Sequence, residues 1–181
     1  MQSPRWVKIK YVDASALVKL YIDENGSQNL REFFYSNMAN FLTTWLCLAE
    51  ALNILKSKWV GKQSKDSATK IERDKYLKST IDLVVDWRGR IDSDDLKEYD
   101  PSLPLKVREI ADKYGLDYSD ALQLITIKTG EFSVLSFESA PGVYEPASVL
   151  ITADVGLASA AESEGIRVCN CTTGPTTEWL Y

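Results

Sequence analysis

The chain has 181 residues, an acidic balance with a net charge of −5, and no histidine. This length fits one domain with a sizeable core. The missing histidine excludes histidine acid–base catalysis, a serine–histidine–aspartate triad and a histidine-ligated zinc site. The negative charge argues against binding nucleic acid through the whole surface, and no apolar run is long enough for us to expect a transmembrane helix.

The N-terminal segment MQSPRWVKIKYVD has no apolar run followed by a small-residue cleavage site, so we expect a cytoplasmic protein. Residues 7–13 alternate and then turn apolar, which predicts a strand ending at Asp13. The following ASALVKLYIDE has apolar residues at helical spacing, with Ser15 as a candidate cap. Glu24-Asn25-Gly26 predicts the end of this helix, and a second helix begins at Ser27.

The middle of the chain predicts a short strand within ANFLTTWLC and then a strong helix, LCLAEALNILKSKWV, with Glu50 in its first half. Gly61 ends this helix. A polar helix over about residues 64–88 follows, and RIDSDDL is a candidate short strand.

The second half of the chain predicts two further helices, the first opened by Pro101 and Pro104 and closed by Gly115. The second runs through DYSDALQLITIKTG. Residues 131–147 contain two prolines and a glycine and are predicted to be irregular. The last elements are the apolar strand SVLITAD, the helix VGLASAAESEG, the strand IRVCNC and a C-terminal tail.

This alternation of strands and helices predicts a parallel sheet with helices on both faces, in one domain spanning residues 1–181. In such sheets ligands bind beyond the carboxyl ends of the strands. Asp13 and Asp154 are both predicted to lie at strand ends, each near a hydroxyl, from Ser15 and Thr152 respectively. Either acid can be a metal ligand or, as an equally ordinary alternative, the cap of the next helix.

Two further acids lie in apolar helical sequence. Glu50 is flanked by leucine and alanine, and glutamate is almost never fully buried unless it is paired. Asp120 lies one turn into its predicted helix, and Asp117 precedes it by three residues on the same face. Asp117 is also a candidate cap of that helix.

Several carboxylates that meet in apolar surroundings repel one another and lose hydration, so they need a neutralising charge. Mg²⁺ or Mn²⁺ is the simplest answer, because these ions prefer carboxylate and water oxygens. Two such ions about 4 Å apart can activate water and stabilise the leaving oxygen of a phosphodiester without any residue that titrates near neutrality.

The acids lie in the segments YVDASALVKLYIDE, AEALNIL, LDYSDALQL and ITADVGLASAAESEGIRV. Together these segments resemble the PIN-domain ribonucleases, especially the VapC-type toxins of bacterial and archaeal toxin–antitoxin pairs, over about residues 10–170. The resemblance implies a three-layer α/β/α sandwich with a central, mostly parallel sheet. It also implies metal-dependent endonucleolytic cleavage of RNA, a homodimer, and neutralisation by a small antitoxin.

By this resemblance the residues that hold Mg²⁺ or Mn²⁺ are Asp13, Glu50, Asp120 and Asp154, and their neighbours are Ser15, Asp117 and Thr152. Two segments are longer than the family pattern needs: a helical extension around residues 57–100 and an irregular insertion around residues 131–149. The expected homodimer also draws on the aromatic residues Phe33, Phe34, Tyr35 and Trp45, for which the alternative is ordinary core.

RNA binding by an acidic chain would rest on a local basic patch, for which residues 5–10 and 51–75 are candidates. The alternative for these residues is a solvated helical face. For the whole chain the alternative is a catalytically inactive PIN-like module that binds RNA or protein. A third hypothesis, a phosphotransferase or phosphatase with Asp13 as nucleophile, is weakened because no acid follows Asp13 two residues later.

Overall fold

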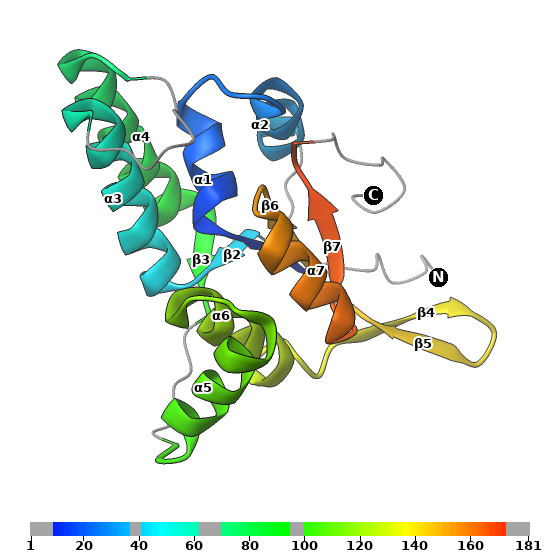
Figure 1. The fold of residues 1–181 in the computed structure, drawn as a ribbon. Coiled ribbons are helices and arrows are strands. Elements are labelled where there is room, and N and C mark those ends of the chain that lie inside the picture. Colours follow the sequence, from blue (N-terminus) through cyan, green and yellow to red (C-terminus); the bar gives the residue numbers. More distant parts are fainter. Residues whose placement is uncertain (1–8, 37–40, 62–69, 95–99, 173–181) are drawn as a thin grey trace.

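A five-stranded sheet in the order β3-β2-β1-β6-β7 forms the centre of the molecule (Figure 1). The computed structural model describes residues 9–36, 41–61, 70–94 and 100–172. All neighbouring strands of this sheet pair in parallel, as predicted from the alternation of strands and helices. The strands are β1 (Ile9–Val12), β2 (Phe41–Thr43), β3 (Ile91–Ser93), β6 (Ser148–Thr152) and β7 (Arg167–Asn170).

Seven helices in the described ranges cover the two faces of the sheet. One face packs against α1 (Ala14–Tyr21), α2 (Ser27–Ser36), α3 (Trp45–Val60) and α4 (Arg73–Gly89). The other packs against α5 (Leu103–Tyr114), α6 (Tyr118–Thr129) and α7 (Val155–Ser163). The predicted three-layer α/β/α sandwich is therefore confirmed. None of these helices is long and apolar enough to cross a membrane.

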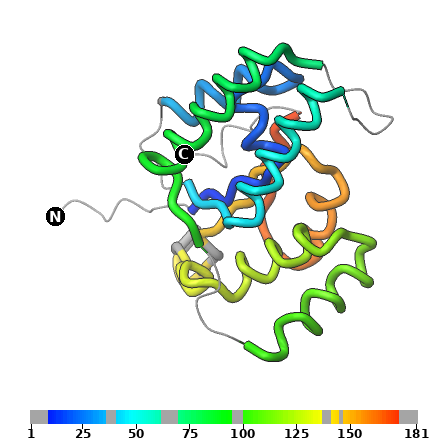
Figure 2. The backbone as a smooth tube through the Cα atoms, turned by 90° about the vertical axis from the view of Figure 1, so that its left-hand side faces the viewer, coloured from blue at the N-terminus to red at the C-terminus, as the bar shows by residue number. Residues whose placement is uncertain are grey.

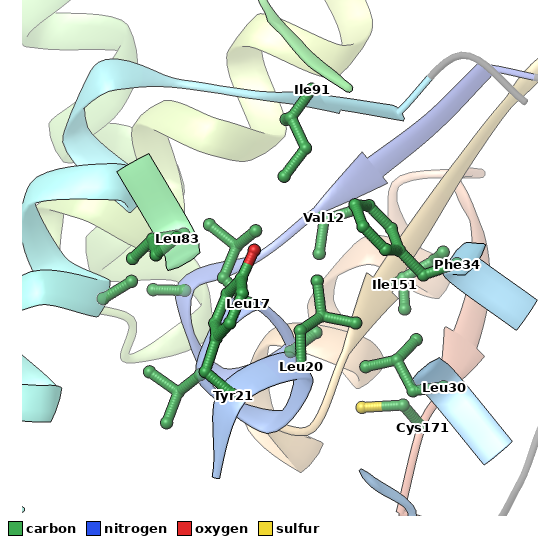
Figure 3. Close-up of a cluster of buried hydrophobic side chains, with 14 of the residues drawn as sticks. Val12, Leu17, Leu20, Tyr21, Leu30, Phe34, Leu83, Ile91, Ile151 and Cys171 are labelled. Carbon is green, nitrogen blue, oxygen red and sulfur yellow. The ribbon is translucent and has the colours of Figure 1, made fainter. Parts of the chain in front are cut away.

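The two faces of the sheet have separate cores because successive strand side chains point to opposite sides. Val12 and Ile151 belong to the larger core with α1 to α4, and Figure 3 shows them beside Leu17 and Phe34. Tyr11 and Leu150, one residue earlier on the same strands, belong to the core with α6 and α7.

Two helix boundaries differ from the sequence predictions. Asp13, not Ser15, caps α1: its side chain accepts a hydrogen bond from the Ser15 amide. The polar helix predicted over residues 64–88 begins only at Arg73, with Glu72 as its cap. Residues 62–69 lie outside the described part, but residues 70–72 are not helical. At α1 both Asp13 and Ser15 are residue types that cap helices, and the structure decided between them. At α4 the side chain of Glu72 makes no capping hydrogen bond.

The segment predicted to be irregular contains a two-stranded antiparallel hairpin, β4 (Ser136–Ala140) and β5 (Val143–Pro146). Its loop is Pro141-Gly142, and Gly142 adopts a φ of +77°. A two-residue loop whose glycine has positive φ joins antiparallel strands closely. Proline and glycine there mark a turn between strands rather than a long loop. In Figure 1 the hairpin projects from the body of the molecule.

Helix α4 lies at the rim of the molecule, with α3 and α1 on its inner side (Figure 1, Figure 2). Figure 2 shows α3 and α4 side by side, running in opposite directions. Trp45 packs edge-on against Trp87 at one end of this pair, and Trp59 stacks on Tyr76 at the other. The segment after residue 57 thus packs on α1 and α3 and adds edge strand β3 to the sheet. That residues 1–181 form one domain stays a prediction.

Candidate functional site

The parallel pairing of β1 with β6 brings two of the predicted acids to one edge of the sheet. The register places Val12 beside Ile151, so Asp13 lies next to Thr152, and Asp154 follows two residues later. The Asp13 amide continues the ladder by donating to the Ile151 carbonyl at 3.0 Å. Both acids therefore lie just beyond the carboxyl ends of adjacent strands, where parallel sheets place their ligands.

Asp13 is buried and held by three hydrogen bonds to its Oδ2 atom. The donors are the Ser15 amide at 3.1 Å, the Ser15 hydroxyl at 2.5 Å and the Thr152 hydroxyl at 3.0 Å. Burial raises the pKa of Asp13, and the hydrogen bonds from Ser15 and Thr152 act in the opposite direction. The Asp13 carboxylate thus keeps a defined orientation at a place where its charge is poorly solvated.

Asp154 lies two residues beyond the end of β6 and is exposed. Its Oδ1 atom accepts from the Leu157 amide at 2.8 Å and caps α7. Its own amide donates to the Thr152 hydroxyl oxygen at 2.9 Å, and the Ala153 amide donates to the Ser15 hydroxyl oxygen at 2.9 Å. The cap alternative is thus observed for Asp154 and for Asp13, and the charges of both capping carboxylates still act on Glu50.

Glu50 projects from the second turn of α3 and is half-buried. Its Oε2 atom is buried and has no hydrogen-bond partner in the structure. Burial raises the pKa of Glu50, and the charges of Asp13, Asp117 and Asp154 raise it further. A buried carboxylate oxygen without a donor is costly, so this atom is the strongest sign of a missing partner at the site.

Asp120 lies in the first turn of α6, behind the cap residue Asp117. Asp117 Oδ1 accepts from the Asp120 amide at 3.0 Å and from the Ser119 hydroxyl at 2.7 Å. Burial acts to raise the pKa of Asp117, but these hydrogen bonds outweigh it and hold that pKa below its usual range. The cap alternative for Asp117 is therefore confirmed.

The structure brings the predicted acids close enough to act on one another electrostatically. The pKa of Asp120 is raised to about 8, first by burial and then by the charges of Asp13, Asp117, Glu50 and Asp154. These side chains come from the ends of β1 and β6 and from α3 and α6, which are far apart in sequence. A proton or a cation is therefore needed before all of them can share this edge of the sheet.

The carboxylates do not enclose a single point as they stand: in the described ranges, no group of three or more acidic or cysteine side chains is placed to hold one metal ion. The geometry explains this, because Asp13 Oδ2 and Asp154 Oδ1 each accept hydrogen bonds from the protein. Repulsion also favours side-chain positions that keep like charges apart. The oxygen donors nevertheless fit Mg²⁺ or Mn²⁺, which prefer carboxylates, and the orphaned Glu50 Oε2 is the donor such an ion would satisfy.

Sequence reasoning missed Ser119, which donates to Asp117 and also lowers the pKa of Glu50. The only signal was its place between two acids in DYSD. The proposed basic patch is smaller than predicted: Lys58 is buried against Glu24, and Lys10 is buried beside the rings of Phe33 and Phe41. Neither lysine can contact phosphate, since a buried ammonium group has no access to a ligand at the surface. Arg5, Lys8, Lys62 and Lys65 lie outside the described residues.

The model of the family described as "PIN domain" matches residues 10–163. No curated protein matches the chain. A solved structure titled "Crystal Structure of PAE2754 from Pyrobaculum aerophilum" is 19% identical, covers 92% of this chain and 92% of its own, and superposes with a TM-score of 0.47.

Proposed function

The chain belongs to the PIN domain family, and from this premise we propose that it is a metal-dependent endoribonuclease that hydrolyses RNA phosphodiester bonds. The observation that carries the proposal is the buried, unpartnered Glu50 Oε2 atom among acids whose charges raise the pKa values of Glu50 and Asp120. A purely structural cluster would be expected to satisfy that oxygen with a donor of its own.

Asp13, Glu50, Asp120 and Asp154 are the residues proposed to hold Mg²⁺ or Mn²⁺, with Ser15, Asp117 and Thr152 as their neighbours. When bound, such an ion supplies an activated water as nucleophile and stabilises the leaving oxygen of the phosphodiester. The chain's own part is to hold the carboxylates in place. Ser15 and Thr152 orient Asp13, and the Ser119–Asp117 hydrogen bond holds the first turn of α6, which carries Asp120.

The expected position of each proton follows from the raised pKa values. Without a cation, Asp120 keeps its proton up to about pH 8, which relieves repulsion among the acids. A divalent cation favours the ionised forms, so binding releases protons from the site. Metal affinity should consequently rise with pH between about 6 and 8.

We also propose that the chain is the toxin of a toxin–antitoxin pair, acting in the cytoplasm and neutralised by a small antitoxin. The support is the resemblance of the acidic motifs to VapC-type toxins. The test is growth arrest when the chain alone is expressed, relieved by co-expression of the protein encoded next to it. Growth unaffected by the chain would contradict the toxin assignment and leave the nuclease assignment to be tested separately.

The nuclease proposal is tested by incubating purified protein with structured and unstructured RNA, in Mg²⁺, in Mn²⁺ and in EDTA. We expect endonucleolytic products with 5′ phosphates in either metal and none in EDTA. Asp13→Asn and Asp120→Asn should each abolish cleavage. Asp112→Asn is the matched control, because Asp112 is exposed on α5, where it pairs with Arg108 at 3.3 Å.

Three results would contradict the proposal. Cleavage by Asp13→Asn at the parent rate in excess Mg²⁺ would show that the acids are not the catalytic centre. Binding of RNA without cleavage in any metal would favour the inactive, PIN-like binding module instead. Trapping of a phosphorylated Asp13 would favour the phosphotransferase or phosphatase alternative.

A further inference from the structure

Gln123 on α6 is a buried amide for which the packed core provides no partner. Its side chain is 1% exposed, and within the described part of the chain neither Nε2 nor Oε1 forms a hydrogen bond. Burying an amide without hydrogen bonds costs free energy, and native proteins satisfy the great majority of buried polar groups. An orphaned amide at such a position therefore indicates a partner outside the packed core.

Gln123 lies on the face of α6 that meets the acids. Ser119 precedes it by four residues and Asp120 by three, which are the spacings of neighbours on one helix face. Ser119 forms a side-chain hydrogen bond to Glu50 of α3, and the charge of Glu50 acts on Asp120. In the other direction Ile127, four residues later, belongs to the core between α6 and the sheet. Gln123 thus lies between the acids and that core.

The usual direction of helical side chains turns the amide toward the acids. Each Cα–Cβ bond of an α-helix tilts toward the N-terminus, and long side chains lie over the preceding turn. The turn before Gln123 is the first turn of α6, which carries Ser119 and Asp120. A glutamine at this position can therefore present its amide to the edge at which Glu50 projects from α3.

The two orphaned groups are chemically complementary. Glu50 Oε2 is a buried acceptor without a donor, and Gln123 Nε2 is a buried donor without an acceptor. They come from α3 and α6, which are in contact. An ionised carboxylate offers about four acceptor positions, so a cation and an amide can bind to it together. Because a cation offsets the repulsion among the acids, we expect the two groups to pair when the cation draws the carboxylates together.

We propose that Gln123 is a positioning residue of the site formed by Asp13, Glu50, Asp120 and Asp154: its amide donates to Glu50 and holds that carboxylate toward the bound cation. The inference rests on the proposed Mg²⁺ or Mn²⁺ site and adds one residue to it. Groups that hydrogen-bond to metal ligands orient them, and their removal typically costs about 10- to 100-fold in metal affinity.

Calorimetric titration with Mn²⁺, without RNA, measures this role directly. Gln123→Met keeps the length of the side chain, removes both polar atoms and suits a helix. We expect its Mn²⁺ dissociation constant to be about 10- to 100-fold higher than that of the parent. Thr126→Val is the matched control and should bind Mn²⁺ as the parent does, because Thr126 is also buried on α6 and its hydroxyl donates to the Leu122 carbonyl. Equal affinity of Gln123→Met and the parent overturns the proposal.

Urea denaturation in EDTA separates a positioning role from a structural one. An amide without a partner in the metal-free fold does not stabilise that fold, and an apolar side chain of the same shape is nearly neutral or stabilising there. The urea midpoint of Gln123→Met should therefore equal or exceed that of the parent. A clearly lower midpoint would show that the amide is paired within the fold, and the proposal would fail.

Cleavage of RNA over a Mn²⁺ series gives a second readout of the loaded site. Gln123→Met should need about 10- to 100-fold more Mn²⁺ for half-maximal cleavage and should reach the parent rate at saturation. A rate that stays reduced at saturating Mn²⁺ would give Gln123 a direct part in the reaction and overturn the positioning role.

The two proposals can fail separately. A parent chain that binds Mn²⁺ but cleaves no RNA would contradict the nuclease proposal, while calorimetry would still decide the role of Gln123. A parent chain that binds no Mn²⁺ would overturn both.

Discussion

The Thr152 hydroxyl donates to Asp13 Oδ2 at 3.0 Å, although 139 residues separate the two along the chain. The same hydroxyl oxygen accepts from the Asp154 amide at 2.9 Å. One side chain thus ties the end of β1 to the end of β6 and sets the position of two acids at once. Because the link is buried, its loss should be visible both in stability and in metal binding.

Thr152→Val should lower the free energy of unfolding by about 2 kcal/mol, since a buried carboxylate loses a donor. Urea denaturation measures this directly. Thr126→Val is the control: Thr126 is also buried, but its hydroxyl donates only to the Leu122 carbonyl of its own helix. If both substitutions lower the free energy of unfolding equally, the hydrogen bond from Thr152 to Asp13 does not stabilise the fold more than an ordinary hydrogen bond within a helix.

Asp120→Asn should stabilise the metal-free protein near neutral pH. In the folded chain the pKa of Asp120 is about 8, well above the ordinary value of 3.8. The unfolded chain therefore releases this proton at lower pH than the folded chain, and stability falls as the pH rises from about 4 to 8. Asparagine removes that dependence. We expect the melting temperature in EDTA at pH 8 to rise by a few degrees, since about 1 kcal/mol shifts it by roughly 2–4 °C in chains of this size.

Melting curves of the parent and Asp120→Asn at pH 5 and at pH 8 check both the sign and the pH window. The difference in melting temperature between Asp120→Asn and the parent should be small at pH 5 and larger at pH 8. Asp112→Asn, on exposed α5, should follow the parent at both. A variant that is less stable than the parent at pH 8 would show that the carboxylates do not repel one another there.

Glu24→Gln should be strongly destabilising, because Glu24 neutralises two buried lysines. Lys19 Nζ lies 3.2 Å from Glu24 Oε2, and Lys58 Nζ contacts Oε1. Burial acts to raise the pKa of Glu24, but the two lysines outweigh it and lower that pKa. Removing one charge from such a group leaves buried cations uncompensated, at about 3 kcal/mol. Stability from Glu24 is present above its ordinary pKa and is lost as the pH falls through the lowered value.

Urea denaturation at pH 7 compares Glu24→Gln with Asp82→Asn. Asp82 pairs with Lys78 on the exposed side of α4, where an ion pair contributes less than about 1 kcal/mol. If the two variants are equally stable, the buried lysines do not depend on Glu24.

Tyr11→Phe should destabilise the fold, because a buried carboxylate depends on the Tyr11 hydroxyl. The Tyr11 hydroxyl donates to the buried carboxylate of Asp94, and burial together with this hydrogen bond raises the pKa of Tyr11. Without the hydroxyl, Asp94 loses its nearest side-chain donor, and we expect a loss of about 2–3 kcal/mol. Tyr118→Phe is the control, as its exposed hydroxyl donates to the Pro104 carbonyl and its loss should change the unfolding free energy little. Both are read by chemical denaturation.

Much of the fold could be predicted because its signals are local. The helix over LCLAEALNILKSKWV and the apolar strand before Asp154 follow from spacing alone, as α3 and β6 show. The hairpin of β4 and β5 could not, because its strands are defined by pairing with each other and the intervening Pro141-Gly142 resembles an ordinary loop. The start of α4 at Arg73 could not be predicted either, since the sequence is polar on both sides of that boundary.

Which acidic residues follow strands or open helices could be predicted from the chain alone, because capping and strand ends are properties of neighbouring residues. Which of these charges act on one another, and which are neutralised elsewhere, depends on how distant segments pack together. This packing brings Glu50 to Asp120 across the sheet edge and buries Lys10 and Lys58 away from any ligand. The energy of a charge depends on its burial and on its distance from other charges. Both are set by contacts between segments that are far apart in sequence.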